Sequence, residues 1–290
     1  MLCNKKLTIG YLITMGIEAL KKENIESYIL DAQLLLAKAI DKDRLFVMLN
    51  RDKVIEENQA QIYKEYIDLR KNKMPIKYIL GQCEFMGLNF NVKQGVLIPR
   101  PDTEVLVETC LKDIKDKNYK TVADVCCGSG IIGICISSFV KDVNVDCYDI
   151  DDIPIEVTSE NIKINEVEEK VKVFKSDLLN YAIDNHKKYD IIVSNPPYIK
   201  EEVIPTLMED VKNFEPHLAL SGGLDGLFFY RKIIKQSKSV LNDKGTLAFE
   251  IGYDQREDVE KILLENGFSN IQSFKDLAGL DRVVKGEYLK

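Results

Sequence analysis

Groups that commonly hold metal ions are scarce in this chain. Among its 290 residues there are only two histidines, His186 and His217, and none of the seven cysteines forms a C-x-x-C pair. Structural zinc sites and disulfide frameworks depend on such spacings. We therefore expect no metal and ordinary reduced thiols, in keeping with a reducing compartment.

Long apolar runs and an excess of positive charge are also lacking. No run approaches the about 20 apolar residues of a membrane-spanning helix, and the opening MLCNKKLTIG lacks the continuous apolar segment of a secretion signal. The formal net charge of -7 argues against broad, nonspecific binding to nucleic acid. These absences predict a cytoplasmic protein with no membrane function and no direct nucleic-acid substrate.

The first 75 residues show apolar residues at helical spacing. Intervals of three, four and seven place each set on one face of a helix. No strand pattern interrupts them, so we predict a small helical bundle over residues 1–75. The three sets are Ile9, Leu12, Ile13 and Leu20; Ile29, Ala32, Leu36, Ala39 and Ile40; and Ile55, Gln59, Ile62, Tyr63 and Tyr66.

Residues 76–98 carry the signals of a β-hairpin. Alternating apolar residues flank a Met86-Gly87 turn, which is typical of two short antiparallel strands. Such a hairpin would link the helical bundle to a second domain over residues 99–290. The apolar residues are Phe85 before the turn and Leu88, Phe90 and Val92 after it.

From residue 120 onward, apolar runs alternate with amphipathic stretches. We interpret TVADVCC, VNVDCYDI, VKVFKSD, YDIIVSN and GTLAFEIG as strands, and stretches such as PIEVTSENIKINE and GLFFYRKIIKQSKSVL as helices. The alternation predicts right-handed crossovers and a mostly parallel α/β sheet covered on both faces. Two last strand candidates in residues 267–289 are joined by a turn alone, so they pair antiparallel or lie apart.

Within this second half, DVCCGSGIIG places Gly128, Gly130 and Gly133 in a G-x-G-x-x-G pattern between a strand and a helix. The glycines allow a tight turn and a close approach of a ligand to the backbone. Asp149 closes the next strand, where a carboxylate can accept both hydroxyl protons of a ribose. A nicotinamide dehydrogenase and an S-adenosylmethionine-dependent methyltransferase both fit this layout.

The following strand helps to separate these two enzyme classes. Asp177 lies just past its end, where the carboxylate can accept from an adenine amino group while the N–H of Leu178 points at a ring nitrogen. Taken alone, Asp177 is also typical of a helix N-cap. Cys126 and Cys127 have no neighbouring histidine to activate them. We interpret them as small turn residues whose backbone faces the cofactor.

The strand YDIIVSN ends in the segment Asn195-Pro196-Pro197-Tyr198. An amide or aromatic amine is a weak nucleophile because its nitrogen lone pair is delocalised, and two acceptors aimed at its N–H groups stabilise the reacting nitrogen. Asn195 offers its side-chain oxygen, the proline pair keeps backbone carbonyls free of a helix, and Tyr198 supplies an aromatic wall. The pattern predicts in-line transfer of a methyl group from a sulfonium to nitrogen, without a covalent enzyme intermediate.

Taken together, these blocks resemble the HemK/PrmC family of protein-(glutamine-N5) methyltransferases, which modify a glutamine of peptide chain release factors. The fold implied is the Rossmann-like sheet of class I S-adenosylmethionine-dependent methyltransferases, parallel with an antiparallel C-terminal hairpin and preceded by the helical bundle. Asn-Pro-Pro-Tyr alone is shared with DNA and RNA amino-methyltransferases. The matching blocks run in order along nearly the whole chain: MPIKYILGQCEFMGLNFNV, VLIPRPDTE, DVCCGSG, YDI, SDLL, SNPPYI, FEPHLALSGGLDGLFFYRKI and AGLDRVV.

The resemblance also implies roles for residues. Asn195, Pro196 and Tyr198 would be catalytic, and together with Pro197 they would hold the glutamine amide. S-adenosylmethionine, which leaves as S-adenosylhomocysteine, would bind to Cys126, Cys127, Gly128, Ser129, Gly130, Asp149, Asp177, Leu178 and Asn195.

Other parts of the chain follow from the same resemblance. The N-terminal helices would bind class I release factors, and we expect a monomer. Arg100, Asp102 and Thr103 lie in a block characteristic of the family, where Asp102 or Thr103 also fits the N-cap of a helix. Cys126 stands where this turn commonly carries glycine, and a small thiol with backbone-mediated contacts should tolerate the position.

Three other functions stay open. A DNA or RNA amino-methyltransferase would use the same Asn-Pro-Pro-Tyr site, although the acidic charge and the lack of a base-readout module count against it. A nicotinamide dehydrogenase is compatible with the glycine pattern, but this function does not explain the presence of residues 195–198. A catalytically silent RNA- or ribosome-associated protein would bind the cofactor without transferring its methyl group.

Overall fold

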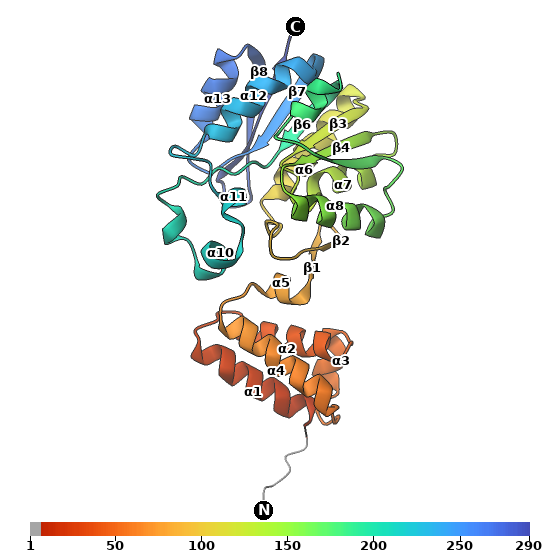
Figure 1. Ribbon diagram of the computed structural model, residues 1–290, viewed down its shortest axis with the longest axis vertical. Helices are drawn as coiled ribbons and strands as arrows, with labels where there is room; N and C mark the ends of the chain where they lie inside the picture. The colour runs from red at the N-terminus through yellow and green to blue at the C-terminus, as the bar shows by residue number, and fades with distance from the viewer. Residues whose placement is uncertain (1–6) are drawn as a thin grey trace, which may run out of the picture. The chain divides into compact units, whose positions relative to one another are not determined.

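A computed structural model describes residues 7–290 (Figure 1). The described chain packs as two compact units: one comprises the residues up to Gly81 together with Met208–Phe214, and the other comprises Gln82–Leu207 and Glu215–Lys290. The division into residues 1–75, 76–98 and 99–290 stays a prediction, and Cys3 lies outside the described residues. Among those residues, no helix has the length and apolar character needed to cross a membrane.

The first unit is helical, as the apolar spacing predicted. Thr8 caps its first helix by accepting a hydrogen bond from the N–H of Tyr11, and the buried ion pair between Arg70 and Asp31, at 2.7 Å, joins the fourth helix to the second. The short third and fifth helices were not predicted. The helices are α1 (Ile9–Lys22), α2 (Tyr28–Ala39), α3 (Arg44–Leu49), α4 (Glu57–Lys71), α5 (Ile76–Leu80) and, later in the chain, α10 (Glu209–Phe214).

Two residues of the predicted apolar faces are not in the core of this unit. Ile29 is 48% exposed and Ile62 is 37% exposed. The buried stripe of α2 runs through Leu35 instead, and that of α4 runs through Ala60 and Ile67. Both helices carry more apolar residues than one stripe can hold, so sequence spacing alone did not decide which of them face inward.

The predicted hairpin begins the second unit. Strands β1 (Gln82–Phe85) and β2 (Leu88–Asn91) pair antiparallel, and Met86 and Gly87 both have positive φ, as a tight two-residue hairpin turn requires. The hairpin is fixed to helix α8 (Asp152–Ile164), because the Asn161 side chain accepts from the Asn91 N–H at 2.6 Å and donates to the Asn91 carbonyl at 3.0 Å.

The rest of the second unit is built on a seven-stranded sheet within the described chain, and the predicted fold class is confirmed. The strand order is β5-β4-β3-β6-β7-β9-β8. The first five strands in this order are parallel, and β9 is antiparallel to both β7 and β8. The strands are β3 (Thr121–Val125), β4 (Asn144–Asp149), β5 (Val171–Lys175), β6 (Tyr189–Ser194), β7 (Leu241–Glu250), β8 (Phe268–Lys275) and β9 (Asp281–Tyr288).

Helices cover both faces of this sheet (Figure 1). Helices α6, α7 and α8 pack side by side on one face, and α9, α12 and α13 pack on the other. The chain leaves β3 in one direction toward β4 and β5, and returns to β6 on its other side. This reversal opens a crevice at the carboxyl ends of the strands. The further bounds are α6 (Thr103–Lys117), α7 (Ile131–Phe139), α9 (Asn180–Asp184), α11 (His217–Leu220), α12 (Phe228–Val240), α13 (Arg256–Glu265) and the short 3-10 helix η1 (Ile204–Thr206).

Candidate active site

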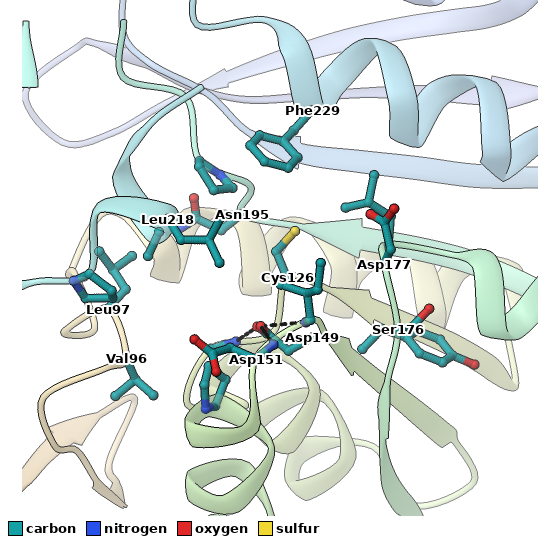
Figure 2. Close-up of a pocket in the computed structure, with 18 of the residues that line it drawn as sticks. Val96, Leu97, Cys126, Asp149, Asp151, Ser176, Asp177, Asn195, Leu218 and Phe229 are labelled. Atoms are coloured by element: carbon teal, nitrogen blue, oxygen red, sulfur yellow. Dashed lines mark hydrogen bonds between the residues drawn. The ribbon is translucent and has the colours of Figure 1, made fainter. Parts of the chain in front are cut away.

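A cavity of about 300 Å³ lies at the carboxyl ends of β3, β4, β5 and β6 (Figure 2). Its wall combines the turns after these four strands with two further segments and the first turn of α12. The predicted residues in the wall are Cys126, Gly128, Asp149, Asp177, Leu178, Asn195 and Pro197. The other predicted residues lie within two positions of a wall residue in the sequence but are not part of the wall: Cys127, Ser129, Gly130, Pro196 and Tyr198.

The glycine turn after β3 requires left-handed backbone. Gly128 and Gly130 have φ of 59° and 77°, and a Cβ on Gly130 would stand 2.8 Å from the Thr158 side chain. Cys126 has φ of 60° as well, which costs a non-glycine residue about 1–2 kcal/mol. This conformation is the physical reason that glycine suits the position of Cys126.

Asp149 holds the glycine turn against the end of β4. Its Oδ2 accepts from the Gly128 N–H at 2.9 Å, and its Oδ1 accepts from the N–H groups of Ile150 and Asp151 at 2.8 and 3.3 Å. Burial raises the pKa of this carboxyl group, and the backbone donors act against that shift. The carboxylate is therefore held in one place at the cavity wall, with part of its accepting capacity free.

Two buried polar residues of α8 support the same turn from behind, and sequence reasoning missed both. The Thr158 hydroxyl donates to the Gly128 carbonyl at 3.0 Å, and the Asn161 amide donates to the Ser129 carbonyl at 2.9 Å. Both side chains are fully buried. The available signal was two polar residues three positions apart on the inward face of an amphipathic helix.

Asp177 lies in the turn after β5, facing the cavity (Figure 2). Helix α9 begins only at Asn180, with Leu179 as its N-cap, so the Asp177 side chain does not cap it. Leu178 has φ of 52°. Within residues 7–290 its N–H donates to no protein acceptor, which leaves that N–H available to a ligand.

Asn195 follows the last residue of β6 and reaches the cavity wall. Its Nδ2 donates to the hydroxyl oxygen of Thr103, at 3.4 Å. Thr103, the first residue of α6, therefore has a contact that the sequence did not reveal. Within the described chain no hydrogen bond reaches the carbonyl oxygen of Pro196. The segment thus keeps two oxygens, one from a side chain and one from the backbone, without a protein donor.

Tyr198 is fixed by groups far away in sequence. Its hydroxyl donates to Glu250 Oε1 at 3.3 Å, and its carbonyl accepts from the Gln255 side chain at 3.0 Å. A Cβ on Gly222 would stand 2.7 Å from the Tyr198 Cα, and one on Gly226 would stand 2.5 Å from its carbonyl oxygen. The block SGGLDG therefore needs glycine so that two backbone segments can approach closely.

One ion pair joins the two segments that complete the cavity. Glu215 accepts from Arg100 at 2.5 Å and from the Ile98 N–H at 3.4 Å. These contacts bring Leu97 and Leu218 to the same side of the cavity, opposite Asp177 (Figure 2). The role of this pair was not predicted, because neither residue carries a local signal for the other.

The charge of the wall is mostly negative. Its described residues include the carboxylates of Asp149, Asp151 and Asp177 and one cation, Lys232. The Lys232 ammonium lies 4.6 Å from the centre of the Phe228 ring, which also lines the cavity, so its charge is partly offset by the face of that ring. A ligand with positive charge fits this wall better than one with several negative charges.

Comparisons with known proteins agree with this geometry. The family model of the methyltransferase small domain matches residues 101–225, and that of the PrmC N-terminal domain matches residues 12–81. The chain is 61% identical over 274 residues to the release factor glutamine methyltransferase of Clostridium botulinum, covering 94% of this chain and 97% of the relative. It is 52% identical to the protein of the same name from Clostridium acetobutylicum, covering 91% and 93%.

A solved structure shows the same fold in a more distant protein. The 16S rRNA N2 G1207 methyltransferase of T. thermophilus, in complex with AdoMet and guanosine, superposes with a TM-score of 0.51 at 16% identity. The match covers 71% of this chain and 49% of that one. At this identity the likeness concerns the fold alone.

Proposed function

The chain belongs to the release factor glutamine methyltransferase family, and from this premise we propose that it methylates the side-chain nitrogen N5 of a glutamine in class I peptide chain release factors. The observation that carries the proposal is the orientation of the Asn195 side-chain amide. Its nitrogen donates a hydrogen bond to the Thr103 hydroxyl, so its oxygen is left for the cavity. An acceptor in that place suits an N–H of a substrate amide.

The cavity has the donors and acceptors that S-adenosylmethionine needs. When bound, S-adenosylmethionine supplies a methyl group on a positively charged sulfur. Asp149 would accept hydrogen bonds from the ribose, and Asp177 with the Leu178 N–H would bind the adenine. The backbone at Cys126 and Gly128 would lie against the methionyl part. The three wall carboxylates favour a cationic ligand, whereas the pyrophosphate of a nicotinamide cofactor would meet repulsion.

The Asn-Pro-Pro-Tyr segment would hold the acceptor amide. The Asn195 side-chain oxygen and the Pro196 carbonyl accept the two N–H groups, which favours the lone pair of the amide on nitrogen. Tyr198 and the prolines limit the freedom of the bound amide. One N–C bond forms as one C–S bond breaks, and the methylated amide loses one N–H proton to water. Residues 195–198 stabilise the reacting nitrogen most strongly in the transition state.

The helical unit is proposed to recognise the release factor. Its surface exposes large apolar side chains, including Leu45 and Leu49 of α3, at 63% and 74%. Exposed apolar groups in one short helix are a common feature of protein-binding surfaces. We also propose that the enzyme acts as a monomer.

Intact-mass analysis of a co-expressed release factor tests the proposal. We expect the mass of one added methyl group, located on a glutamine by fragmentation, and no addition with the Asn195→Ala enzyme. A parallel incubation with methyl-labelled S-adenosylmethionine and total nucleic acid tests the alternative amino-methyltransferase. Label in nucleic acid and none in the release factor would contradict the proposal, and so would binding of NADH without binding of S-adenosylmethionine.

A further inference from the structure

Glu250 lies next to the Asn-Pro-Pro-Tyr segment, although it is the last residue of another strand, β7. Only 2% of its surface is exposed. Its Oε1 accepts from the Tyr198 hydroxyl at 3.3 Å, and its buried Oε2 has no partner at full hydrogen-bond geometry among residues 7–290. A buried carboxylate oxygen without a donor is unfavourable, so a hydroxyl close by is expected to turn toward it.

Thr103 supplies that hydroxyl. It is 1% exposed, and its oxygen accepts from Asn195 Nδ2 at 3.4 Å. A hydroxyl that accepts from one neighbour can donate its proton to another. Burial raises the pKa of Glu250 to about 7, and hydrogen bonding from Thr103 and Tyr198 acts against that shift. If the Thr103 hydroxyl turns toward the unpartnered Oε2 of Glu250, the donors run in one direction, from Asn195 to Thr103 and from Thr103 to Glu250.

The carboxylate fixes this direction because it only accepts hydrogen bonds. With the Thr103 proton committed to Glu250, the Asn195 amide can satisfy Thr103 only through its NH2 group. Its oxygen then stays on the cavity side. A flipped amide would present N–H donors to the N–H groups of a substrate amide, and the two sets of donors would repel each other.

We propose that Glu250 is a positioning residue that sets the orientation of the Asn195 amide through Thr103 while it holds Tyr198 directly. One buried carboxylate would then fix both ends of the Asn-Pro-Pro-Tyr segment. This inference rests on the proposed function, because the orientation matters only if the Asn195 oxygen receives a substrate N–H.

Isosteric variants test the direction of the hydrogen bonds. Glu250→Gln keeps the shape but adds an NH2 donor, so kcat should fall at least about tenfold while the Kd of S-adenosylhomocysteine stays within about threefold. Thr103→Val, which lacks the hydroxyl, should behave like Glu250→Gln. Thr103→Ser keeps the hydroxyl and should stay within about threefold of the wild-type kcat. If Glu250→Gln fails to fold, the Val and Ser variants of Thr103 decide the question.

A double-mutant cycle separates positioning from mere stability. In an Asn195→Ala background, Glu250→Gln should lower kcat by a clearly smaller factor than in the wild type, because the Asn195 side chain is absent and only the contact with Tyr198 is still affected. A purely structural role would give the same loss in both backgrounds and a matching fall in Tm. That result would overturn the inference.

The pH profile gives a second readout. Besides Tyr198, the charged and titratable groups around Glu250 are Asp102, just before α6, Arg282 of β9 and Tyr230 of α12. A protonated Glu250 can donate a hydrogen bond as well as accept one, so it no longer fixes the direction of the Thr103 hydroxyl. Wild-type kcat should therefore decline below about pH 7. This acidic limb should be absent in Glu250→Gln, and a limb that persists there would count against the inference.

The outcomes for the inference and for the proposed function are distinguishable. A wild-type enzyme that methylates no glutamine would remove the proposed function and the inference with it. An active wild type with an inactive Asn195→Ala variant, but with full kcat in Glu250→Gln and Thr103→Val, would overturn the inference alone.

Discussion

The carboxylate of Asp149 accepts a hydrogen bond from the backbone N–H of Gly128, at 2.9 Å. This contact ties the end of β4 to the turn after β3, across the position where parallel α/β sheets bind ligands. One acidic side chain therefore shapes the turn and also faces the cavity.

Replacing Asp149 should weaken cofactor binding. Asp149→Ala removes the acceptor and frees the Gly128 N–H, so we expect the Kd of S-adenosylmethionine to rise at least about tenfold in calorimetry. Asp151→Asn is the matched control, because Asp151 also lies in the wall but its side chain accepts a hydrogen bond from the adjacent Asp152 N–H and does not hold the glycine turn. Equal affinities for wild type and Asp149→Ala would refute the assignment.

Replacing Asn195 should affect transfer far more than binding. The lost oxygen acts on the reacting nitrogen, so Asn195→Ala should largely abolish methylation while the Kd of S-adenosylmethionine stays within roughly tenfold. The exposed Asn185, whose amide donates to the Tyr181 carbonyl, provides a control as Asn185→Ala. Single-turnover kinetics and calorimetry measure the two effects, and wild-type turnover in Asn195→Ala would exclude the proposed role.

Replacing Gly130 should destabilise the second unit. Gly130→Ala combines φ of 77° with a Cβ only 2.8 Å from Thr158, and we expect the free energy of unfolding to fall by about 2–4 kcal/mol. Gly279→Ala is the matched control, because Gly279 has φ of 82° but nothing within 4 Å of an added Cβ. That variant should lose only about 1 kcal/mol in urea denaturation. Similar losses in both variants would show that the contact with Thr158 is unimportant.

The stability of the fold should depend on the pH through Asp124. This fully buried residue accepts from the Gly133 N–H at 2.9 Å, and burial raises its pKa from 3.8 to about 7. At pH values between these two pKa values, Asp124 holds a proton in the folded state but has lost it in the unfolded state. The free energy of unfolding should therefore fall as pH rises from about 4 to 7, by on the order of 1 kcal/mol per pH unit.

The Asp124→Asn variant isolates this contribution. It cannot ionise, so its free energy of unfolding should change less steeply over the same pH range than that of the wild type. Urea denaturation at several pH values measures the two slopes. The pKa of Glu250 is also raised to about 7, but Glu250 contributes equally to both proteins and does not affect the comparison. Equal slopes in the two proteins would therefore contradict the assignment to Asp124.

Much of the fold could be predicted because its signals are local. The Met86-Gly87 turn, the apolar strand runs and the short connector before β9 each encode backbone geometry within a few residues. The positions of Asp149, Asp177 and Asn195 at strand ends were predictable for the same reason. Parallel strands gather such residues at one edge of a sheet.

The contacts that hold the site could not be predicted in this way. Thr103 is 92 positions from Asn195, and Glu250 is 52 positions from Tyr198. No periodicity or spacing connects residues so far apart. Whether Ile29 faces the core or the solvent is likewise decided by the packing of neighbouring helices, because the sequence offers more apolar residues than the buried stripe uses.

The sequence by itself therefore determined which backbone segments form the sheet and which polar groups stand at its carboxyl edge, since both depend on local conformation. Only the tertiary structure decided which way the Asn195 amide points and what holds Tyr198 in place. The physical reason is that a hydrogen bond takes its direction from the partner, and the partners here come from α6 and β7, which folding alone brings beside β6.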